Sequence, residues 1–212
     1  MAMRVGSSMS VNSALCYLRE RLFKVHIGLL WIWLLACVLT TATEPLGQIV
    51  WLTISSLLLL ATFRLWDDLE DVEYDRRRFP QRCLVRMADR RAVYATLVLL
   101  ILLLTTLLSW FVSVERGVAF LIFVALFAVM YRVTGNNGAA LRQLRITMVL
   151  MKYPAFVLLL AAHPGERMVL LAAISACLPP LLHEVRSSGI KTLLFAVIFM
   201  GIPATAWLFL IT

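Results

Sequence analysis

Residues 67–75 read Asp67-Asp68-Leu69-Glu70-Asp71-Val72-Glu73-Tyr74-Asp75, and the organisation of the chain follows from them. These nine positions hold six of the twelve acidic residues in the sequence. They come directly after an apolar run and directly before three consecutive arginines. A dense group of carboxylates at the edge of an apolar segment is costly unless something neutralises it, so the stretch indicates a chemical role.

If this stretch is helical, a rotation of about 100° per residue puts Asp68, Asp71 and Asp75 within an arc of roughly 60° on one face. Asp67 lies beside that face. Converging carboxylates repel one another unless a cation is present, and hard oxygen ligands suit Mg²⁺, which commonly bridges carboxylates to phosphates. The stretch therefore predicts a Mg²⁺ and diphosphate site with these four aspartates as metal ligands. The alternative is a solvated acidic turn that the neighbouring arginines neutralise.

The composition predicts a membrane protein. Apolar residues make up 62% of the 212 residues, and the mean hydropathy is +0.89. Both values are typical of a polytopic membrane protein rather than a soluble domain. Apolar runs of membrane length predict an all-α transmembrane bundle of about seven helices. The expected spans are 25–43, 48–66, 92–112, 117–133, 144–162, 167–185 and 191–211.

The basic residues predict how the chain is oriented, because cytoplasmic loops collect lysine and arginine. Eighteen of the twenty fall in the N-terminal segment or in alternate loop regions, and only Arg116 and Arg167 fall in the others. We therefore expect a multi-pass integral membrane protein whose N-terminus and Asp-rich site are cytoplasmic. The net charge of +8 does not indicate nucleic-acid binding, because topology and anionic membrane lipid already account for it.

Two regions are expected along the chain. Residues 1–24 form an N-terminal cytoplasmic segment, and residues 25–212 form a single transmembrane helical domain. Leu15, Leu18 and Leu22 alternate with basic residues, which fits a short interfacial helix or the frayed start of the first span.

The cysteines predict no covalent framework. They are scattered, with no Cys-x-x-Cys pair and no histidine at ligand spacing. Neither a disulfide framework nor a zinc site is therefore expected. The positions concerned are Cys16, Cys37, Cys83 and Cys177.

Several basic side chains are candidates for contact with phosphate. Arginine presents planar donors that match phosphate oxygens, and of those after the acidic stretch we favour Arg82 and then Arg78. Arg64, one turn before Asp68, can pair with that carboxylate or with a bound phosphate.

Lys152 lies about two turns inside the fifth expected span. A lysine at such depth usually faces the bundle interior and a partner, which here is a diphosphate or an aspartate. Snorkelling to the interface is the alternative. Pro154 is expected to kink the same helix and widen a cavity.

The motifs resemble those of the UbiA superfamily of intramembrane prenyltransferases. Its first signature is an Asn/Asp-Asp-x-x-Asp-x-x-x-Asp run at the cytoplasmic end of the second helix, followed by an Arg-Pro-Leu segment. The four aspartates match that run in order, and Arg82-Cys83-Leu84 resembles the second piece with Cys in place of Pro. In the family the run binds Mg²⁺ and the diphosphate of an isoprenyl substrate. The resemblance therefore implies those roles for Asp67, Asp68, Asp71 and Asp75, the last three being catalytic.

The resemblance extends to the loop between the fourth and fifth helices, where the family carries a tyrosine and a Lys/Arg pair near the substrate. Tyr131, Arg142 and Arg145 look like the counterparts at wider spacing. Together with the basic candidates above, the expected contacts to the substrate diphosphate are therefore Arg78, Arg82, Tyr131, Arg142, Arg145 and Lys152.

The second Asp-rich motif of the family is present only in part. Gly189-Ile190-Lys191-Thr192-Leu193 resembles its close, but Leu181 and Val185 stand where paired aspartates are expected. Glu184 is the carboxylate left there, so it either takes over a catalytic metal contact or this side of the site is lost. His183 is expected to cap the helix, with a role as base toward a carbocation as the alternative.

The resemblance implies Mg²⁺-dependent ionisation of an isoprenyl diphosphate and transfer of the prenyl group to an aromatic or lipid acceptor. A terpene cyclase, which captures the same allylic cation intramolecularly, is the close alternative. A non-catalytic membrane scaffold is the third hypothesis. Aromatic side chains expected to stabilise the cation are Trp31, Trp33, Trp66, Tyr131 and Tyr153.

Overall fold

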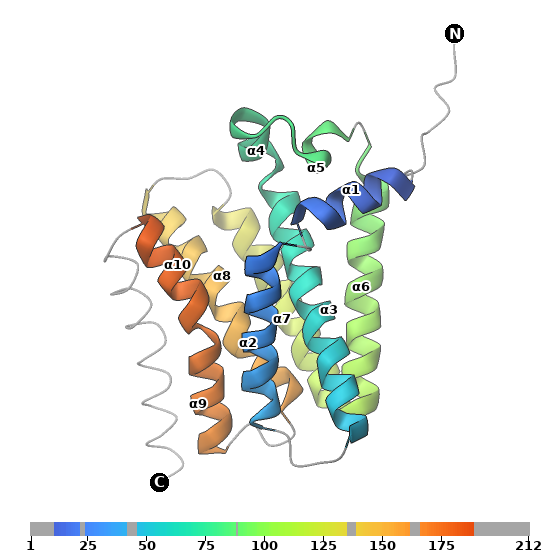
Figure 1. Cartoon of the computed structure of the whole chain (residues 1–212), viewed down its shortest axis with the longest axis vertical. Coiled ribbons are helices and arrows are strands. Elements are labelled where there is room, and N and C mark those ends of the chain that lie inside the picture. The colour runs from blue at the N-terminus through green and yellow to red at the C-terminus, as the bar shows by residue number, and fades with distance from the viewer. Residues whose placement is uncertain are drawn as a thin grey trace.

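The computed structural model of the chain describes residues 11–21, 24–41, 46–87, 89–134, 139–161 and 166–188. All regular secondary structure in these ranges is helical, which confirms the all-α prediction. The long helices of the described chain run side by side as a bundle, and shorter helices lie at one end of it (Figure 1). The bundle helices are α2 (Val25–Leu39), α3 (Leu46–Glu70), α6 (Arg91–Phe111), α7 (Val114–Thr134), α8 (Ala139–Leu160) and α9 (Arg167–Ala176), continued by α10 (Leu178–Ser188). The end helices are α1 (Val11–Arg21), α4 (Val72–Arg78) and α5 (Cys83–Arg86).

Four helical stretches of the described chain are long and apolar enough to cross a membrane, namely Gly47–Glu70, Arg91–Phe111, Val114–Thr134 and Arg167–Glu184. They overlap four of the expected spans. Helix α2 is apolar but has 15 residues, and α8 has 22 residues with Pro154 inside. The expected span at 191–211 lies outside the described residues, so the count of seven and the membrane orientation stay predictions.

The stretch expected as one helix over 167–185 is two helices, α9 and α10, which meet at Cys177. Pro179 and Pro180 occupy the first turn of α10 and have no N–H to donate back into α9. The carbonyl of Ser175, four residues before Pro179, instead accepts a hydrogen bond of 2.9 Å from the indole of Trp33. This hydrogen bond at the break therefore connects α9 to α2.

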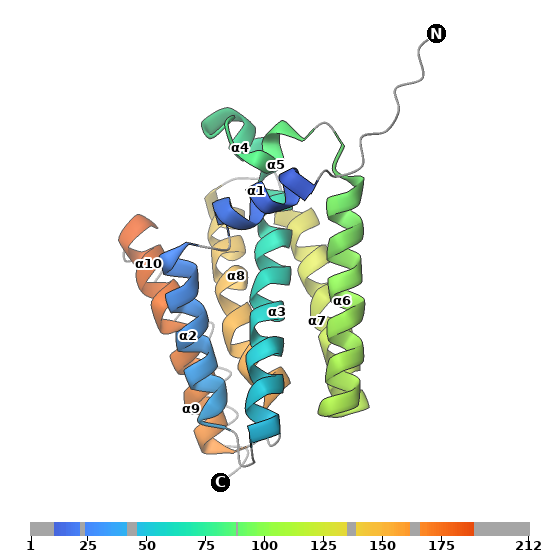
Figure 2. The same ribbon diagram turned by 45° about the vertical axis from the view of Figure 1, so that its right-hand side comes forward.

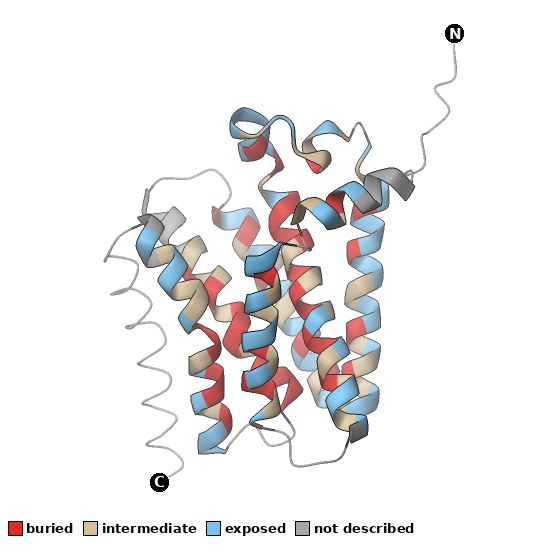
Figure 3. Ribbon diagram, in the orientation of Figure 1, coloured by how far each residue is buried: buried red, intermediate tan, exposed pale blue. Residues whose placement is uncertain are grey.

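Helix α3 lies at the centre of the bundle, where it packs against α2, α6 and α8 (Figure 2). Phe63 on α3 is fully buried, and its ring meets those of Phe120, Phe127 and Phe156 at centroid distances of 5.2 to 6.4 Å. Buried residues line the inner faces of the helices, and exposed ones face outward (Figure 3). On α6 the outward residues include large apolar side chains such as Leu99, as expected of a helix that faces lipid.

Helices α6 and α7 pack closely through a small residue. Gly117 on α7 is buried, and a Cβ atom there would collide with the Ser109 hydroxyl and lie 3.1 Å from the main-chain oxygen of Thr105, both on α6. Small residues permit such close approach between membrane helices. At the same end of the bundle, Arg116 donates to the main-chain oxygens of Leu158 (2.9 Å) and Ala161 (3.4 Å), which satisfies carbonyls at the end of α8.

Replacing Gly117 with alanine is expected to destabilise the bundle by about 1–3 kcal/mol, because the added methyl group pushes α7 away from Thr105. The matched control is Gly28→Ala on α2, where a Cβ meets nothing within 4 Å. That change should leave stability unchanged or raise it slightly, because alanine favours the helix. Thermal unfolding in detergent measures both variants. Equal midpoints would contradict the close contact.

Candidate active site

The Asp-rich stretch lies where α3 ends and the short helices begin. Asp67 and Asp68 are buried in the last turn of α3, and Asp75 is buried in α4. Asp71 interrupts the helix as the N-cap of α4, with φ −87° and ψ 0°. The main-chain N–H of Asp71 still donates to the main-chain oxygen of Asp67 (3.0 Å), and that of Asp75 donates to the main-chain oxygen of Asp71 (2.8 Å). The predicted helix over 67–75 is therefore interrupted at Asp71, and these two main-chain hydrogen bonds bridge the interruption.

Asp67 accepts hydrogen bonds from the ammonium group of Lys152 and from the hydroxyl group of Tyr131. Lys152 is only 3% exposed and comes from α8, and Tyr131 comes from the last turn of α7. A charged lysine at this depth is tolerated only beside an opposite charge, which Asp67 provides. The structure therefore places Lys152 in the interior and not in a snorkelling position.

Asp68 and Asp75 both contact α1. Arg21 Nη2 lies 2.9 Å from an oxygen of Asp68 and 3.0 Å from an oxygen of Asp75. The hydroxyl of Tyr17, one turn earlier on α1, donates to Asp68 over 3.0 Å. Burial and the Asp68 carboxylate raise the pKa of Tyr17 well above its usual range, so this hydroxyl stays protonated and remains a donor.

Two further arginines neutralise the same carboxylates. Arg64, whose partner the sequence left open, lies 3.4 Å from Asp68. Arg82, the arginine favoured for phosphate contact, pairs with Asp75. Arg78, the second choice, is exposed on α4. Its guanidinium group donates to the hydroxyl of Tyr74, which lies outside this cluster. The structure thus brings Arg82 to the site and leaves Arg78 away from it.

Asp71 pairs with Arg145 of α8. Arg145 Nη2 lies 2.6 Å from an oxygen of Asp71, and the guanidinium carbon lies 5.2 Å from the centroid of the Tyr131 ring. Two of the residues expected from the fourth loop are therefore at the site. Arg142 belongs to α8, but its side chain lies outside the described part of the structure.

The four aspartates divide between two sides, so the prediction that they converge on one point is wrong for this structure. Asp67 and Asp71, four residues apart, meet α7 and α8, while Asp68 and Asp75, seven residues apart, meet α1. Among the described residues, no three of these carboxylates bring oxygens within 4.8 Å of one another. Strong cationic partners on both sides pull them apart.

The residues present fit Mg²⁺ in chemistry but not in their present arrangement. Carboxylate oxygens are the ligands that Mg²⁺ prefers, and the buried setting favours a doubly charged counter-ion. Each of the four carboxylates, however, already has at least one basic partner. A metal ion is held here only if some of these basic side chains exchange the carboxylates for another anion.

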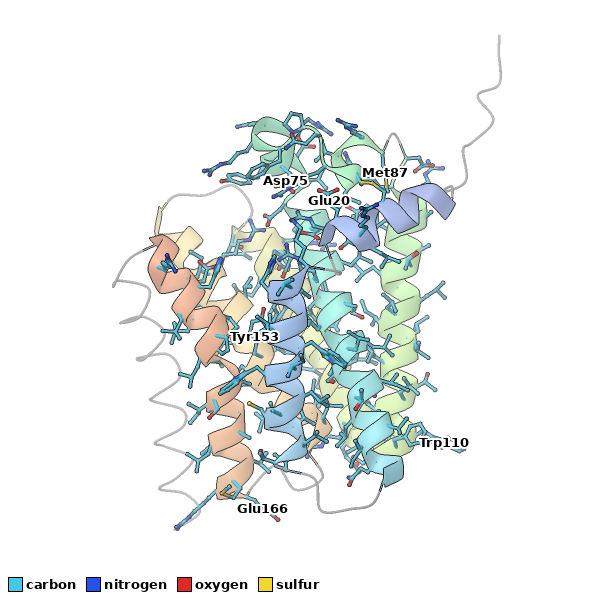
Figure 4. The ribbon with its side chains drawn as sticks, in the orientation of Figure 1. Glu20, Asp75, Met87, Trp110, Tyr153 and Glu166 are labelled. Carbon is cyan, nitrogen blue, oxygen red and sulfur yellow. A yellow bond between two sulfur atoms is a disulfide. The ribbon has the colours of Figure 1, made fainter. Side chains whose placement is uncertain are left out.

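A cavity of about 800 Å³ begins at the Asp-rich site and lies between α2, α3, α8 and α10. Its charged and polar lining residues are His26, Arg64, Asp67, Lys152, His183 and Glu184. Apolar side chains make up most of the remainder, including Leu30, Trp33, Ala36 and Leu60. Tyr153, also on the wall, lies deeper in the bundle than Asp75 (Figure 4). The size is within the usual range for ligand sites, and the lining suits a molecule with a charged head and an apolar tail.

Glu184, from the partial second Asp-rich motif, lines the same cavity as Asp67 of the first motif. Glu184 belongs to α10 and Asp67 to α3, and His183 Nδ1 lies 3.9 Å from a carboxylate oxygen of Glu184. Whether Glu184 serves as a metal ligand stays a prediction. The string from Gly189 to Leu193 lies outside the described residues.

The aromatic candidates fall into three groups. Trp33 and Tyr153 line the cavity. Trp66 and Tyr131 pack against each other in the buried core, with ring centroids 5.9 Å apart and ring planes tilted by 36°. Trp31 donates to the hydroxyl of Ser56 over 3.2 Å, which joins α2 to α3. Only the first group is placed to face a bound tail.

Sequence reasoning missed the part that α1 plays in the site. Tyr17 and Arg21 are one helical turn apart, which was a signal that they share a face. Basic residues before a first span are so common, however, that Arg21 looked like an ordinary topological charge. The expectation of no disulfide is also wrong, because Cys16 of α1 and Cys83 of α5 are bonded to each other.

Replacing Lys152 with methionine is expected to destabilise the protein by about 3–5 kcal/mol, because Asp67 then stays buried without its main counter-charge. Adding Asp67→Asn to that variant should restore much of the loss. Chemical unfolding in detergent of both single variants and the double variant gives the coupling between the two side chains.

The control for this cycle is the exposed pair Arg76 and Glu73, which lie 3.0 Å apart on α4. Removing it with Arg76→Gln should cost less than about 1 kcal/mol. Strictly additive losses for Lys152→Met and Asp67→Asn would show that the two side chains do not interact, contrary to the structure.

The chain matches no protein-family model, no curated protein and no solved structure. The geometry of the site and the cavity beside it therefore carries the argument for function. Two features of that geometry matter most: a buried set of ion pairs at the end of α3, and an apolar space that opens from it.

Proposed function

We propose that the chain is an intramembrane prenyltransferase of the UbiA type, with its Asp-rich site at the cytoplasmic face of about seven spans. It ionises an isoprenyl diphosphate with Mg²⁺ and transfers the prenyl group to an aromatic or lipid acceptor. The position of Asp67 is the observation that carries this proposal. Its carboxylate belongs both to the buried ion pairs and to the lining of the 800 Å³ cavity. A diphosphate with an apolar tail has two ends that suit these two surroundings.

The charge balance of the cluster supports a metal and diphosphate complex. Its four aspartates meet the basic side chains of Arg21, Arg64, Arg82, Arg145 and Lys152. The formal charge is therefore one positive unit. A diphosphate group brings more negative charge than this unit offsets, so entry together with a divalent cation keeps a buried site closer to neutral.

The basic side chains change partners when the substrate binds. Lys152 holds Asp67 and Arg145 holds Asp71 in the structure described here. With substrate bound, Lys152 and Arg145 would donate to diphosphate oxygens, and Asp67 and Asp71 would then be the residues that hold Mg²⁺. Mg²⁺ would supply Lewis-acid stabilisation of the charge that develops on the departing diphosphate. The Tyr131 hydroxyl adds a neutral donor at the same point.

The reaction breaks the bond between the allylic carbon and the diphosphate oxygen, and both electrons leave with the diphosphate. The allylic cation that remains needs a dry surrounding in which aromatic faces stabilise its charge. Trp33 and Tyr153 on the cavity wall supply such faces. A nucleophilic atom of the acceptor then forms the new bond and releases a proton. In the cyclase alternative, a double bond of the same chain takes the place of the acceptor.

The proposal predicts Mg²⁺-dependent release of inorganic diphosphate from farnesyl or geranylgeranyl diphosphate by the purified protein. Asp71→Asn should lower the rate about 100-fold or more, because it removes a carboxylate that faces the reacting diphosphate. Glu73→Gln is the matched control, since Glu73 is an exposed carboxylate two residues away that pairs with Arg76. It should keep nearly the full rate.

The products distinguish the enzymatic outcomes. Prenylated acceptor that appears only when an aromatic or lipid acceptor is added supports transfer, whereas a terpene hydrocarbon or alcohol formed without one indicates a cyclase. If folded protein releases no diphosphate with either substrate in the presence of Mg²⁺, the scaffold hypothesis holds and the proposed function is wrong.

A further inference from the structure

The disulfide between Cys16 and Cys83 fastens α1 to the start of α5. The two Cα atoms are 6.3 Å apart, a separation that disulfides commonly bridge. Glu20, one turn after Cys16, accepts a hydrogen bond of 2.8 Å from the main-chain N–H of Cys83. In Figure 4 the sulfur bond is seen near Met87, with Glu20 and Asp75 labelled close by. The connection therefore lies at the same end of the bundle as the Asp-rich site.

Helix α1, which the disulfide joins to α5, also carries the side chains that contact Asp68 and Asp75. Cys16 and Glu20 are one turn apart on α1, and so are Tyr17 and Arg21, so the two pairs form neighbouring stripes on the helix. The first stripe contacts α5. The second contacts Asp68, and Arg21 reaches Asp75 as well. Where α1 sits relative to α5 therefore sets whether Arg21 reaches both carboxylates.

We propose that Cys16 and Cys83 form a thiol–disulfide lock that regulates access to the Asp-rich site. In the oxidised protein, α1 stays in place and Arg21 occupies Asp68 and Asp75. In the reduced protein, only exchangeable polar and packing contacts hold α1, so it moves off the site. Asp68 and Asp75 are then free of Arg21 and join Asp67 and Asp71 in binding the divalent cation. This inference rests on the proposed Mg²⁺ and diphosphate site, whose regulation it describes.

The lock opens by exchange with a small dithiol. One thiolate of the dithiol attacks a sulfur of the protein disulfide, which breaks the protein S–S bond, forms a mixed disulfide and releases one cysteine thiolate. The second thiol of the reagent then attacks the mixed disulfide and releases the other cysteine. The protein gains two electrons and two protons, and the dithiol becomes a cyclic disulfide. Oxidation by a small-molecule disulfide is the reverse exchange, which yields two small thiols.

The exposure of the cysteines makes this exchange selective. Cys16 is exposed and Cys83 is half-buried, so a reagent in water reaches their bond. Cys37 and Cys177 are unpaired and buried in the bundle. A mild reductant or oxidant therefore acts at the end of α1 and leaves the other two cysteines unchanged.

The test measures how fast trypsin cleaves the full-length protein after Arg21, in detergent, with peptides identified by mass spectrometry. Three samples are compared: protein oxidised with glutathione disulfide, protein reduced with dithiothreitol, and reduced protein with Mg²⁺ and inorganic diphosphate. Reduction should raise the cleavage rate about fivefold or more, because cleavage follows the population in which α1 is displaced. Mg²⁺ with diphosphate should raise it further by occupying the carboxylates that Arg21 leaves.

Two variants sharpen the test. Cys16→Ser should be cleaved at the fast rate with or without dithiothreitol. Cys37→Ser, which changes a buried cysteine outside the lock, should behave like the unaltered protein in all three samples. Should Cys16→Ser fail to fold, chemical reduction of the unaltered protein gives the same comparison.

Equal cleavage of the oxidised and reduced proteins overturns the lock. So does uptake of Zn²⁺ by Cys16, Glu20 and Cys83 in the reduced protein with α1 still protected, because the cysteines would then form a structural metal site. Faster cleavage on reduction with no added effect of Mg²⁺ and diphosphate supports the movement of α1 and counts against the proposed metal site. The comparison of oxidised with reduced protein therefore tests the lock, and the sample with Mg²⁺ and diphosphate tests the proposed metal site.

Discussion

A carboxylate buried inside an apolar helical bundle needs a counter-charge, and the pairing of Asp67 with Lys152 is where this constraint is strongest. Lys152 is almost fully enclosed by the bundle. Removing water from either group alone costs several kcal/mol, so neither is stable there without the other. The pair fixes the C-terminal end of α3 against α8. The Tyr131 hydroxyl on the same carboxylate adds α7 to the arrangement.

The remaining charges of the site extend this arrangement to the short helices. Arg21 on α1 bridges Asp68 and Asp75, and Arg82 joins the turn before α5 to Asp75. These pairs stabilise the site in the absence of any ligand. They are also the groups that a diphosphate and a cation would use, because arginine binds phosphate and carboxylate binds Mg²⁺. In the proposed function, the ligand binds by exchanging one set of charge pairs for another.

The apolar cavity indicates that the charged cluster has a role beyond stabilising the fold. Ion pairs at a helix end serve stability in many proteins, but here the cluster opens into a space with a mostly apolar wall. Asp67 at one end and Trp33 on the wall give that space two chemically different parts. This combination favours an amphiphilic substrate over the scaffold hypothesis.

Much of the fold could be predicted from the sequence, because apolar runs report directly which segments avoid water. The long helices α3, α6 and α7 lie within a few residues of the expected spans. The break at Cys177 was missed because a proline in the first turn of a new helix looks like a kink within an old one. The location of the acidic site at the end of α3 was also predicted. How its carboxylates point was not, because that depends on the interruption at Asp71 and on cations from other helices.

The role of α1 could not be derived from local sequence. Arg21 and Tyr17 lie more than fifty positions from Asp75 and Asp68 respectively, as the sequence separations of 54 and 51 show. Cys16 and Cys83 are 67 residues apart. Contacts at such separations follow from how the helices pack, and a single sequence shows no sign of them. The sequence favoured Arg82 over Arg78, and the turn between α4 and α5 directs the Arg82 side chain to Asp75.

The most direct test of the account is to locate the metal. An experimental structure with Mn²⁺ in place of Mg²⁺ and an unreactive isoprenyl diphosphate analogue would show the ion by its anomalous scattering. The account predicts an ion bound by Asp67 or Asp71 at the end of α3, with Lys152 and Arg145 moved onto the diphosphate and the tail beside Trp33. An ion bound elsewhere, with the aspartates still paired to Lys152 and Arg145, would contradict it.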